Sequence, residues 1–407
     1  MKYGLIGEKL GHSFSKEIHE RLGYDYELKE IAKDELESFM LAKDFVGINV
    51  TMPYKSDVIP YLDEIDDFAK EIGAVNTIVN RDGRLYGYNT DFYGMQELFS
   101  HADIDPYEKK VAILGSGGTS KTAMAVLKNL GAKEIIKVSR SGEVTYDDLY
   151  KKHNDVDIIV NTTPVGMFPA IFEKPVDIDK FRSLSGVIDA VYNPLSTTIV
   201  SRAKAKGIAA EAGLYMLVAQ AIKASELFLN MRYPGYMTEV IYSGIRAEKE
   251  NLVLIGMPSS GKTSVGKILA DKVGAEFIDT DELIMDRIKM PISEFFALHG
   301  EKKFRDIESD IIRELAGRGG LVIATGGGAV LREENVFALR YNGNLLFIDR
   351  PLEELTPTDS RPLSSNRSAL EEMFNKRYPI YNQVCDARIK SVGTPMDVAN
   401  NILENYL

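Results

Sequence analysis

The chain has 407 residues, more than one hydrophobic core supports, because cores stop growing at roughly 250–300 residues. Hydrophobic residues make up 44% of the chain and charged residues 27%, a composition typical of a folded globular protein. The net charge of -11 argues against a surface for nucleic acid or anionic membranes, but it is compatible with a local basic pocket for phosphate groups.

The cysteine count and the apolar runs indicate the compartment. Cys385 is the only cysteine, so the chain cannot form an internal disulfide, as is usual in a reducing environment. The stretch 1–7 predicts a short strand and a turn without the apolar core of a signal peptide. No apolar run approaches the roughly 18–20 residues of a membrane span. We therefore expect a cytoplasmic protein with no membrane partner.

Residues 1–100 alternate strand-like and helix-like segments and predict a small α/β domain. Polar residues cluster at 13–15, 49–55, 73–77 and 87–91. Each cluster also has an ordinary structural interpretation. Ser13 and Ser15 are suited to capping a helix, Asn76 to a turn, and Lys55 to the solvated surface.

A glycine-rich turn, Gly115-Ser116-Gly117-Gly118-Thr119, follows the apolar strand 111–114 and precedes a helical stretch. Such glycines allow backbone N–H groups to approach a pyrophosphate at the positive end of a helix. The pattern alone is a weak signal, Ser120 replaces the usual third glycine, and a purely structural turn is the alternative. The turn predicts a dinucleotide-binding domain of the Rossmann type over residues 101–213.

The strand 134–138 ends at Ser139 and Arg140. Enzymes that use NAD usually place an acidic residue there for the ribose 2′-hydroxyl, whereas a guanidinium suits a 2′-phosphate. Arg140 therefore favours NADPH or NADP over NAD, unless it is only an exposed arginine after a strand.

Three further stretches, at 161–167, 189–194 and 213–220, complete an ordered set of motifs. Together with the four polar clusters, this set resembles the shikimate dehydrogenase family across residues 1 to about 240. The resemblance implies that a helix over 214–240 completes the first domain, and that the substrate is 3-dehydroshikimate. By the family pattern, the substrate contacts are Ser13 and Ser15 for the carboxylate, Thr51, Asn76 and Gln220 for ring hydroxyls, and Tyr192 in the pocket wall, with Gly213 on the cofactor side.

The same resemblance assigns Lys55 and Asp91 as the catalytic pair. NADPH reduction of a ketone needs a proton for the developing alkoxide, and Lys55 is the only basic residue within the matched motifs that can supply it. Asp91 is expected to position the ammonium group and one substrate hydroxyl. His12 and His19 fall outside the catalytic positions and are interpreted as structural residues.

The polar stretch 247–250 marks the expected boundary of a second domain, residues 248–407. Residues 256–263 match the pattern G-x-x-x-x-G-K-[ST] in full, after the apolar strand 252–255 and before a helix, which is a strong signal for ATP binding. Lys262 is expected to reach the β and γ phosphates and Thr263 to bind Mg²⁺. The remaining expected ATP contacts are Ser259, Ser260, Gly261 and Ser264.

The residues after this loop resemble the shikimate kinase family over residues 251–407. Asp279 and Asp281 are expected on one strand, where residues two apart point the same way. The resemblance implies that Asp281 contacts ring hydroxyls and acts as base, and that Asp279 helps to place Mg²⁺. It also implies a carboxylate clamp from Arg305 and Arg377, close backbone approach at Gly327, and a lid over ATP that carries Arg361. The stretch 356–361 contains few arginines for such a lid.

The ordinary interpretation of the two clamp arginines is surface ion pairing with Glu308 and Glu371. For the whole chain, the two halves imply one route: reduction of 3-dehydroshikimate, then phosphorylation of shikimate, in the biosynthesis of chorismate and the aromatic amino acids. The alternatives are a quinate/shikimate dehydrogenase that uses NAD, fusion to a gluconate or nucleoside monophosphate kinase, and a catalytically silent ligand-sensing protein. Formation of a homo-oligomer is left open.

Overall fold

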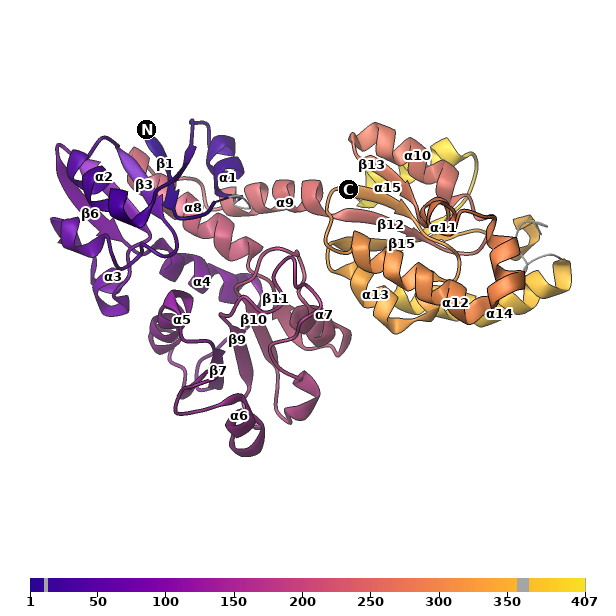
Figure 1. Ribbon diagram of the computed structural model, residues 1–407, viewed down its shortest axis with the longest axis horizontal. Helices are drawn as coiled ribbons and strands as arrows, with labels where there is room; N and C mark the ends of the chain where they lie inside the picture. The colour runs from indigo at the N-terminus through magenta and orange to yellow at the C-terminus, as the bar shows by residue number, and fades with distance from the viewer. Residues whose placement is uncertain (11–13, 357–365, 407) are drawn as a thin grey trace. The chain divides into compact units, whose positions relative to one another are not determined.

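The computed structural model describes residues 1–10, 14–356 and 366–406. The chain divides into two compact units that meet between Ile245 and Arg246 (Figure 1). Each unit is an α/β structure. None of the described helices is both long and apolar enough to cross a membrane.

The first sheet of unit 1 has the strand order β2-β1-β3-β5-β6-β4 within the described residues. Its strands β1, β2 and β3 are parallel, whereas β5 is antiparallel to β3 and β6. The carboxyl ends of β1 and β3 therefore lie at one edge of this sheet. Its elements are β1 (Tyr3–Gly7), α1 (Ser15–Arg21), β2 (Glu27–Glu30), α2 (Leu36–Ala42), β3 (Gly47–Val50), β4 (Glu64–Ile65), α3 (Asp67–Ile72), β5 (Thr77–Arg81) and β6 (Arg84–Tyr88).

The second sheet of unit 1 is parallel throughout, in the order β11-β10-β9-β7-β8. After Lys110, strand β7 is apolar and buried, as expected where helices cover both faces of a sheet. Val111 and Ile113 pack into one cluster with α4 and α5, and Ala112 and Leu114 pack into another with α7. The elements are α4 (Thr90–His101), β7 (Lys110–Leu114), α5 (Gly118–Asn129), β8 (Glu134–Val138), α6 (Tyr146–Lys152), β9 (Ile158–Asn161), β10 (Gly186–Asp189), α7 (Thr198–Ala205) and β11 (Ala209–Glu211).

The stretch 214–240 contains two helices and not the single helix expected to complete the first domain. Helix α8 (Leu214–Leu229) ends at Asn230, whose φ of 51° is left-handed, and α9 (Met237–Lys249) follows. The expected polar linker 247–250 begins inside the last turn of α9. Composition alone does not distinguish the two, because an exposed helical turn carries the same polar residues as a linker. Helix α8 returns to α4, and the two helices lie side by side between the sheets of unit 1 (Figure 1).

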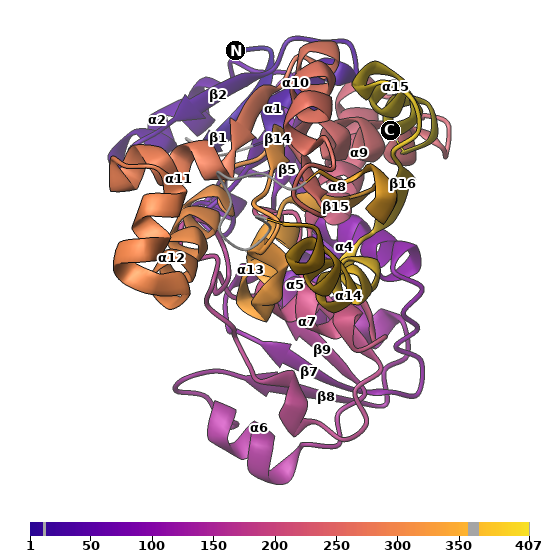
Figure 2. The ribbon, with the colours of Figure 1, turned by 90° about the vertical axis from the view of Figure 1, so that its right-hand side faces the viewer.

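Unit 2 has one parallel sheet in the order β13-β14-β12-β15-β16. Leu252 and Leu254 of β12 pack with α10 and α15, which lie side by side in Figure 2. Helix α12 bends at Gly300, where φ is 76°. The elements are β12 (Asn251–Ile255), α10 (Lys262–Val273), β13 (Glu276–Asp279), α11 (Thr280–Ile288), α12 (Ile292–Leu315), β14 (Leu321–Ala324), α13 (Glu333–Arg340), β15 (Gly343–Asp349), α14 (Arg367–Val384), β16 (Ala387–Lys390) and α15 (Pro395–Tyr406).

Candidate functional sites

A cavity of about 400 Å³ in unit 1 lies where the carboxyl ends of β1 and β3 face α4 and α8. The sequence motifs supply most of its polar lining even though they are up to about 200 residues apart. The predicted residues that line it are Ser15, Thr51, Lys55, Asn76, Asp91, Thr119, Tyr192, Gly213 and Gln220. Ser13 and His12 lie outside the described residues.

Lys55 and Asp91 form an ion pair in this cavity, with Nζ 2.6 Å from Oδ2. The side chains are 24% and 15% exposed, so the pair remains open to a ligand while most of it is shielded from solvent. Asp91 occupies the first turn of α4, which begins at the N-cap residue Asn89. The backbone at Lys55 is fixed by a hydrogen bond in which the Lys55 carbonyl accepts from the backbone N–H of Val75.

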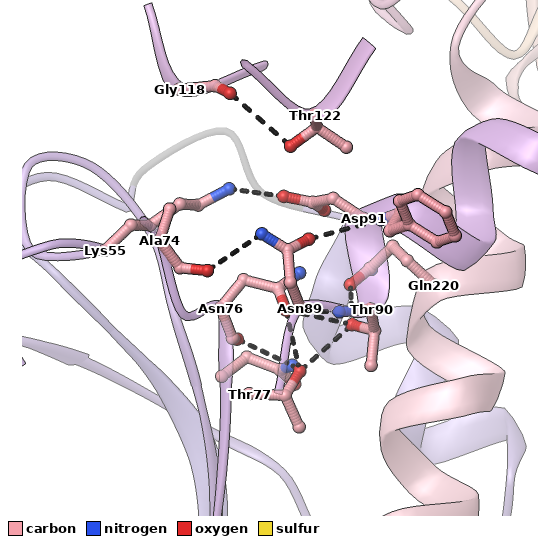
Figure 3. Close-up of polar contacts among 12 residues, drawn as sticks. Lys55, Ala74, Asn76, Thr77, Asn89, Thr90, Asp91, Gly118, Thr122 and Gln220 are labelled. Atoms are coloured by element: carbon pink, nitrogen blue, oxygen red, sulfur yellow. Dashed lines mark hydrogen bonds and ion pairs between the residues drawn. The ribbon is translucent and has the colours of Figure 1, made fainter. Parts of the chain in front are cut away.

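The floor of the cavity is a buried polar cluster (Figure 3). The Asn76 Oδ1 atom accepts a hydrogen bond from the backbone N–H of Thr90 at 2.7 Å. The Thr90 hydroxyl also lies 3.4 Å from Oε1 of Gln220 on α8. The predicted amide residues are therefore brought together, from the position before β5 and from α8, around the N-terminus of α4.

The glycine-rich turn after β7 leaves open space at the start of α5. A Cβ atom on Gly117 or Gly118 would meet nothing within 4 Å, and no side chain caps this helix. Gly115 has a φ of 119°, and a Cβ there would lie 2.7 Å from the Thr162 hydroxyl oxygen. Ser120, which replaces the usual third glycine, donates its hydroxyl to the Gly115 carbonyl at 2.9 Å and so fixes the turn.

Ser139 and Arg140 lie at the same sheet edge as this turn. Leu114 pairs with Val138, and the N–H of Gly115 donates to the Val138 carbonyl at 2.8 Å. Arg140 is exposed next to the turn. Ser116, also exposed, completes the predicted dinucleotide residues at this edge. The arrangement provides free backbone N–H groups and one guanidinium, a combination that suits a pyrophosphate and a ribose phosphate.

Sequence reasoning missed several lining residues of the first cavity. Asn49 and the apolar Met167, Met216 and Leu217 line it, and each lies within a stretch that was recognised only as a whole. Lys9 is a second basic residue in the lining, outside the matched motifs. The sequence could have indicated Lys9 by its position in the turn after β1, at the sheet edge that carries Lys55.

A second cavity, of about 430 Å³, lies in unit 2 beside the phosphate-binding loop. The predicted residues that line it are Thr263, Asp279, Asp281, Arg305, Gly327 and Arg377. Its other walls come from the glycine stretch after β14 and from α11, α12 and α14. Arg361 lies outside the described residues.

The loop 256–263 has the backbone that its glycines predict. Gly256, Ser259 and Gly261 have φ values of 144°, 63° and 97°. Lys262 donates to the carbonyls of Gly256 and Met257 at 3.0 and 2.8 Å, so its ammonium group lies within the loop. The Ser259 hydroxyl donates to the Thr356 carbonyl, Ser260 is buried, and Ser264 is exposed at the start of α10.

The expected placement of Asp281 on a strand is wrong. Strand β13 ends at Asp279, and Asp281 lies in the first turn of α11. Asp279 is the N-cap residue, and its Oδ1 accepts the N–H of Asp281 at 2.9 Å. An aspartate before a polar turn favours a helix start over a longer strand. Both carboxylates still line the cavity.

Thr263 and Asp279 fit the requirement for a magnesium ion. The Thr263 hydroxyl donates to Asp279 Oδ2 at 2.7 Å beside the phosphate-binding loop, and oxygen ligands of this kind suit Mg²⁺. No group of three or more acidic, histidine or cysteine side chains is poised for a metal within the described part of the chain. Mg²⁺ at a nucleotide takes most of its ligands from phosphates and water, so two protein oxygens are sufficient.

Arg305 pairs with Glu308, as the alternative expected, but this pair is buried; a second, longer contact of 3.3 Å reaches the exposed Glu301. Arg305 is 8% exposed, and its Nη1 lies 2.7 Å from Oε2 of Glu308, which is fully buried. Burial raises the pKa of the Glu308 carboxyl, and the nearby Arg305 only partly counteracts this. Arg377 is also buried, whereas Glu371 pairs with Arg367. The surface-pair interpretation therefore fails for both arginines.

Glu308 and Tyr381 are the residues that sequence reasoning missed in unit 2. Glu308 lines the cavity, and its Oε1 has no hydrogen-bond partner among the residues described. The Tyr381 hydroxyl donates to the Gly327 carbonyl at 2.5 Å and holds the glycine stretch against α14. Burial raises the pKa of Tyr381 to about 12, so it remains a donor.

Two family models match the chain. The substrate-binding domain of shikimate dehydrogenase matches residues 5–78, and shikimate kinase matches residues 258–406. The NADP(+) shikimate dehydrogenase of Clostridium beijerinckii is 40% identical over 261 residues, which cover 59% of this chain and 96% of the relative. That of Caldicellulosiruptor bescii is 34% identical and covers 59% of this chain and 94% of its own.

Two solved structures are similar to the first part of the chain. Shikimate dehydrogenase 1 from Peptoclostridium difficile has a TM-score of 0.56 and 36% identity, covering 60% of this chain and 98% of that one. The shikimate 5-dehydrogenase of Thermus thermophilus, solved in complex with NADP(H) and shikimate, has a TM-score of 0.54 and 27% identity, covering 60% and 99%.

Proposed function

The chain belongs to the shikimate dehydrogenase family and carries a shikimate kinase domain, and on this premise we propose that it reduces 3-dehydroshikimate with NADPH and phosphorylates the resulting shikimate with ATP and Mg²⁺. One observation carries this proposal. Each unit has a cavity of about 400 Å³ whose lining suits the same small carboxylated polyol. The first lies beside a dinucleotide turn and the second beside a phosphate-binding loop.

The first cavity binds the substrate through hydroxyl and amide groups. Ser15, together with Ser13, takes the carboxylate, and Thr51, Asn76 and Gln220 take ring oxygens, while Tyr192 forms part of the wall. A site built from such groups discriminates strongly, because a substrate that lacks a matching hydroxyl leaves a buried polar group unpaired.

The chemical step needs a hydride at the ketone carbon, which NADPH supplies, and a proton at the ketone oxygen. Lys55 donates that proton from its ammonium group as the carbon–oxygen double bond opens to an alkoxide. Asp91 orients the ammonium group through the 2.6 Å ion pair. Solvent then returns a proton to Lys55.

The dinucleotide residues fix the cofactor at the edge of the second sheet. The N–H groups at Gly117, Gly118 and Thr119 face the pyrophosphate at the start of α5. Arg140, with Ser139 beside it, takes the 2′-phosphate, and this favours NADPH over NAD. Gly213 lets the chain pass close to Ala190, because a Cβ at this position would collide with the Ala190 carbonyl.

The second cavity binds shikimate for phosphoryl transfer from ATP. Arg305 and Arg377 hold the carboxylate, and Asp281 accepts the proton of the attacking hydroxyl. Lys262 leaves the two carbonyls that it now contacts and turns to the β and γ phosphates. Thr263 and Asp279 hold Mg²⁺, which neutralises charge on the phosphates.

Two single substitutions in the full chain test the proposal. Lys55→Met should lower the rate of 3-dehydroshikimate reduction by at least about 100-fold, because general acid catalysis contributes on this scale, and leave shikimate phosphorylation unchanged. Lys262→Met should have the reverse effect. Reduction of NAD⁺ with quinate at a rate above that for NADP⁺ with shikimate, or no turnover of either proposed substrate by the unaltered chain, would refute the assignment.

The compartment is proposed on the same basis. NADPH, ATP and Mg²⁺ are cytoplasmic reagents, and the one cysteine, Cys385, is free. We place the enzyme in the cytoplasm with small molecules as its partners.

A further inference from the structure

Thr77 is a fully buried residue that does not line the first cavity but lies directly behind it. It is the first residue of β5, and its hydroxyl oxygen lies near three polar groups (Figure 3). Asn49 Nδ2 donates to it at 2.9 Å. Asn76 Oδ1 lies 3.1 Å away, and the Thr90 hydroxyl oxygen lies 3.0 Å away.

The surroundings of Asn76 allow only one orientation of its side-chain amide. The backbone N–H of Thr90 can only donate, so the atom 2.7 Å from it must be Oδ1. The hydroxyls of Thr77 and Thr90 lie near the same oxygen, at 3.1 and 3.2 Å. The Nδ2 group makes no hydrogen bond to any residue that the structure describes, and Asn76 lines the cavity. Two N–H donors are therefore available to a ligand at this point.

The contacts of Asn49 leave the Thr77 proton available to Asn76 Oδ1 or to the Thr90 hydroxyl. The Asn49 Oδ1 accepts from the Tyr26 hydroxyl at 2.7 Å, and its Nδ2 donates to the Asn76 carbonyl and to Thr77. Because the Thr77 oxygen already accepts from Asn49, its own proton is free to go only to the two neighbours on the cavity side. Thr77 thus connects two side-chain amides. In Asn49 both the oxygen and the nitrogen have partners, whereas in Asn76 only the oxygen has partners among the described residues.

We propose that Thr77 is a positioning residue of the dehydrogenase reaction: together with the backbone N–H of Thr90, its hydroxyl holds the Asn76 amide with Nδ2 toward the cavity, so that the site offers N–H donors to a ring oxygen there. This inference rests on the proposed function of unit 1. A flipped amide would present an acceptor instead, so a ketone oxygen could not bind at this point and a hydroxyl could do so only by donating its own proton.

The test uses the full chain with Thr77→Val, which keeps the shape and removes the hydroxyl, and Thr77→Ser, which keeps the hydroxyl. Thr77→Val should lower kcat/KM for 3-dehydroshikimate at least about 10-fold, with KM for NADPH within about 2-fold of the original, as expected for one buried hydrogen bond. Thr77→Ser should recover most of kcat/KM. Phosphorylation of shikimate by the same preparations is the internal control and should not change.

A double-mutant cycle separates positioning from general support of the fold. If Thr77 acts through Asn76, Thr77→Val should cost less than about 2-fold in kcat/KM when Asn76→Ala is already present. Thr77→Ala replaces Thr77→Val if the valine variant does not bind NADPH. Additive losses, or an unchanged kcat/KM in the single variant, overturn the inference. Absence of 3-dehydroshikimate reduction in the unaltered chain would instead refute the proposed function.

Discussion

Arg305 and Glu308 are the clearest case of a residue pair whose role depends on burial. The same spacing of three residues on an exposed helix would give a weak surface pair. Here Glu308 is fully buried and the guanidinium of Arg305 is almost so, and both line the second cavity. A buried pair is costly to break, because the remaining charge has lost its partner and cannot regain water.

Arg305→Met should therefore destabilise unit 2 by about 3–5 kcal/mol, since it leaves the Glu308 carboxylate buried and unpaired. The double substitution Arg305→Met/Glu308→Gln removes both charges and should recover most of that loss, but it should not restore phosphorylation of shikimate. Thermal unfolding of the full chain and the kinase assay measure the two effects. Equal stability of the single and double variants would contradict the account.

At the scale of elements, the contact between α4 and α8 holds the first cavity together. Helix α4 carries Asp91 and α8 carries Gln220, and the helices approach closely at Gly94. A Cβ on Gly94 would lie 2.6 Å from the carbonyl oxygen of Met216 in the backbone of α8. The glycine is required by this approach and not by its own backbone conformation.

Gly94→Ala should force the two helices apart and lower both the Tm of unit 1 and kcat/KM for 3-dehydroshikimate, the latter by at least about 10-fold. Gly244→Ala on α9 is the matched control. Its Cβ would meet only the flexible end of the Arg21 side chain, and alanine favours a helix by about 1 kcal/mol, so stability should hold or rise. Equal effects of the two substitutions would rule out the backbone contact as the cause.

The loops at the carboxyl ends of β9 and β10 are joined by one buried carboxyl group. Asp189 ends β10, is fully buried, and accepts hydrogen bonds from Asn161 Nδ2, the Val191 N–H and the Thr197 hydroxyl. Burial raises the pKa of Asp189 to about 7, although these three donors favour the ionised form. At pH values between the unfolded and the folded pKa, the Asp189 carboxyl is thus protonated in the folded chain but ionised in the unfolded chain.

The sign of the pH dependence follows. An unfolded aspartate has a pKa of about 3.9. Between pH 4 and 7, therefore, Asp189 is protonated mainly in the folded state. The contribution of Asp189 to the free energy of unfolding falls as pH rises through this range, by about 4 kcal/mol at most. Asp189→Asn should remove this falling slope. Calorimetric Tm values of unit 1 from pH 4 to 8, compared with the original chain, measure it, and an unchanged profile would contradict the prediction.

His19 contributes the opposite slope in the same unit. Burial lowers the pKa of His19 to about 3. Below pH ~6.5 the unfolded state therefore binds a proton on His19 that the folded state does not bind. Its stabilising contribution is lost as pH falls from there toward 3. The comparison of Asp189→Asn with the unaltered chain cancels this term, because His19 is present in both.

At the scale of the whole molecule, each unit contains one of the two proposed substrate cavities and one glycine-rich turn suited to a nucleotide. The residues that line each cavity all come from the same unit. Since each lining belongs to one unit, we expect that loss of one site does not impair the other.

A mixture of Lys55→Met and Lys262→Met chains should therefore convert 3-dehydroshikimate to shikimate 3-phosphate when NADPH, ATP and Mg²⁺ are all supplied. Neither variant alone should do so. A coupled assay that follows both NADPH and ADP measures the final rate and the lag before it. With the concentration of each active site matched, a longer lag for the mixture than for the unaltered chain would indicate that tethering raises the local shikimate concentration, whereas equal lags would exclude that effect.

The sequence by itself determined the two glycine-rich turns and the order of motifs, because these depend on local backbone requirements, and from residue type it predicted the roles proposed for Lys55, Asp91, Lys262 and Thr263. Only the tertiary structure decided which side of each polar residue faces a ligand. Asp281 lies in a helix and not on a strand, Glu308 is buried and not exposed, and Thr77 acts from behind the cavity. Burial and hydrogen-bond direction depend on neighbours that are distant in the chain, as Asn49, Asn76, Thr90 and Gln220 are, and no local pattern records those neighbours.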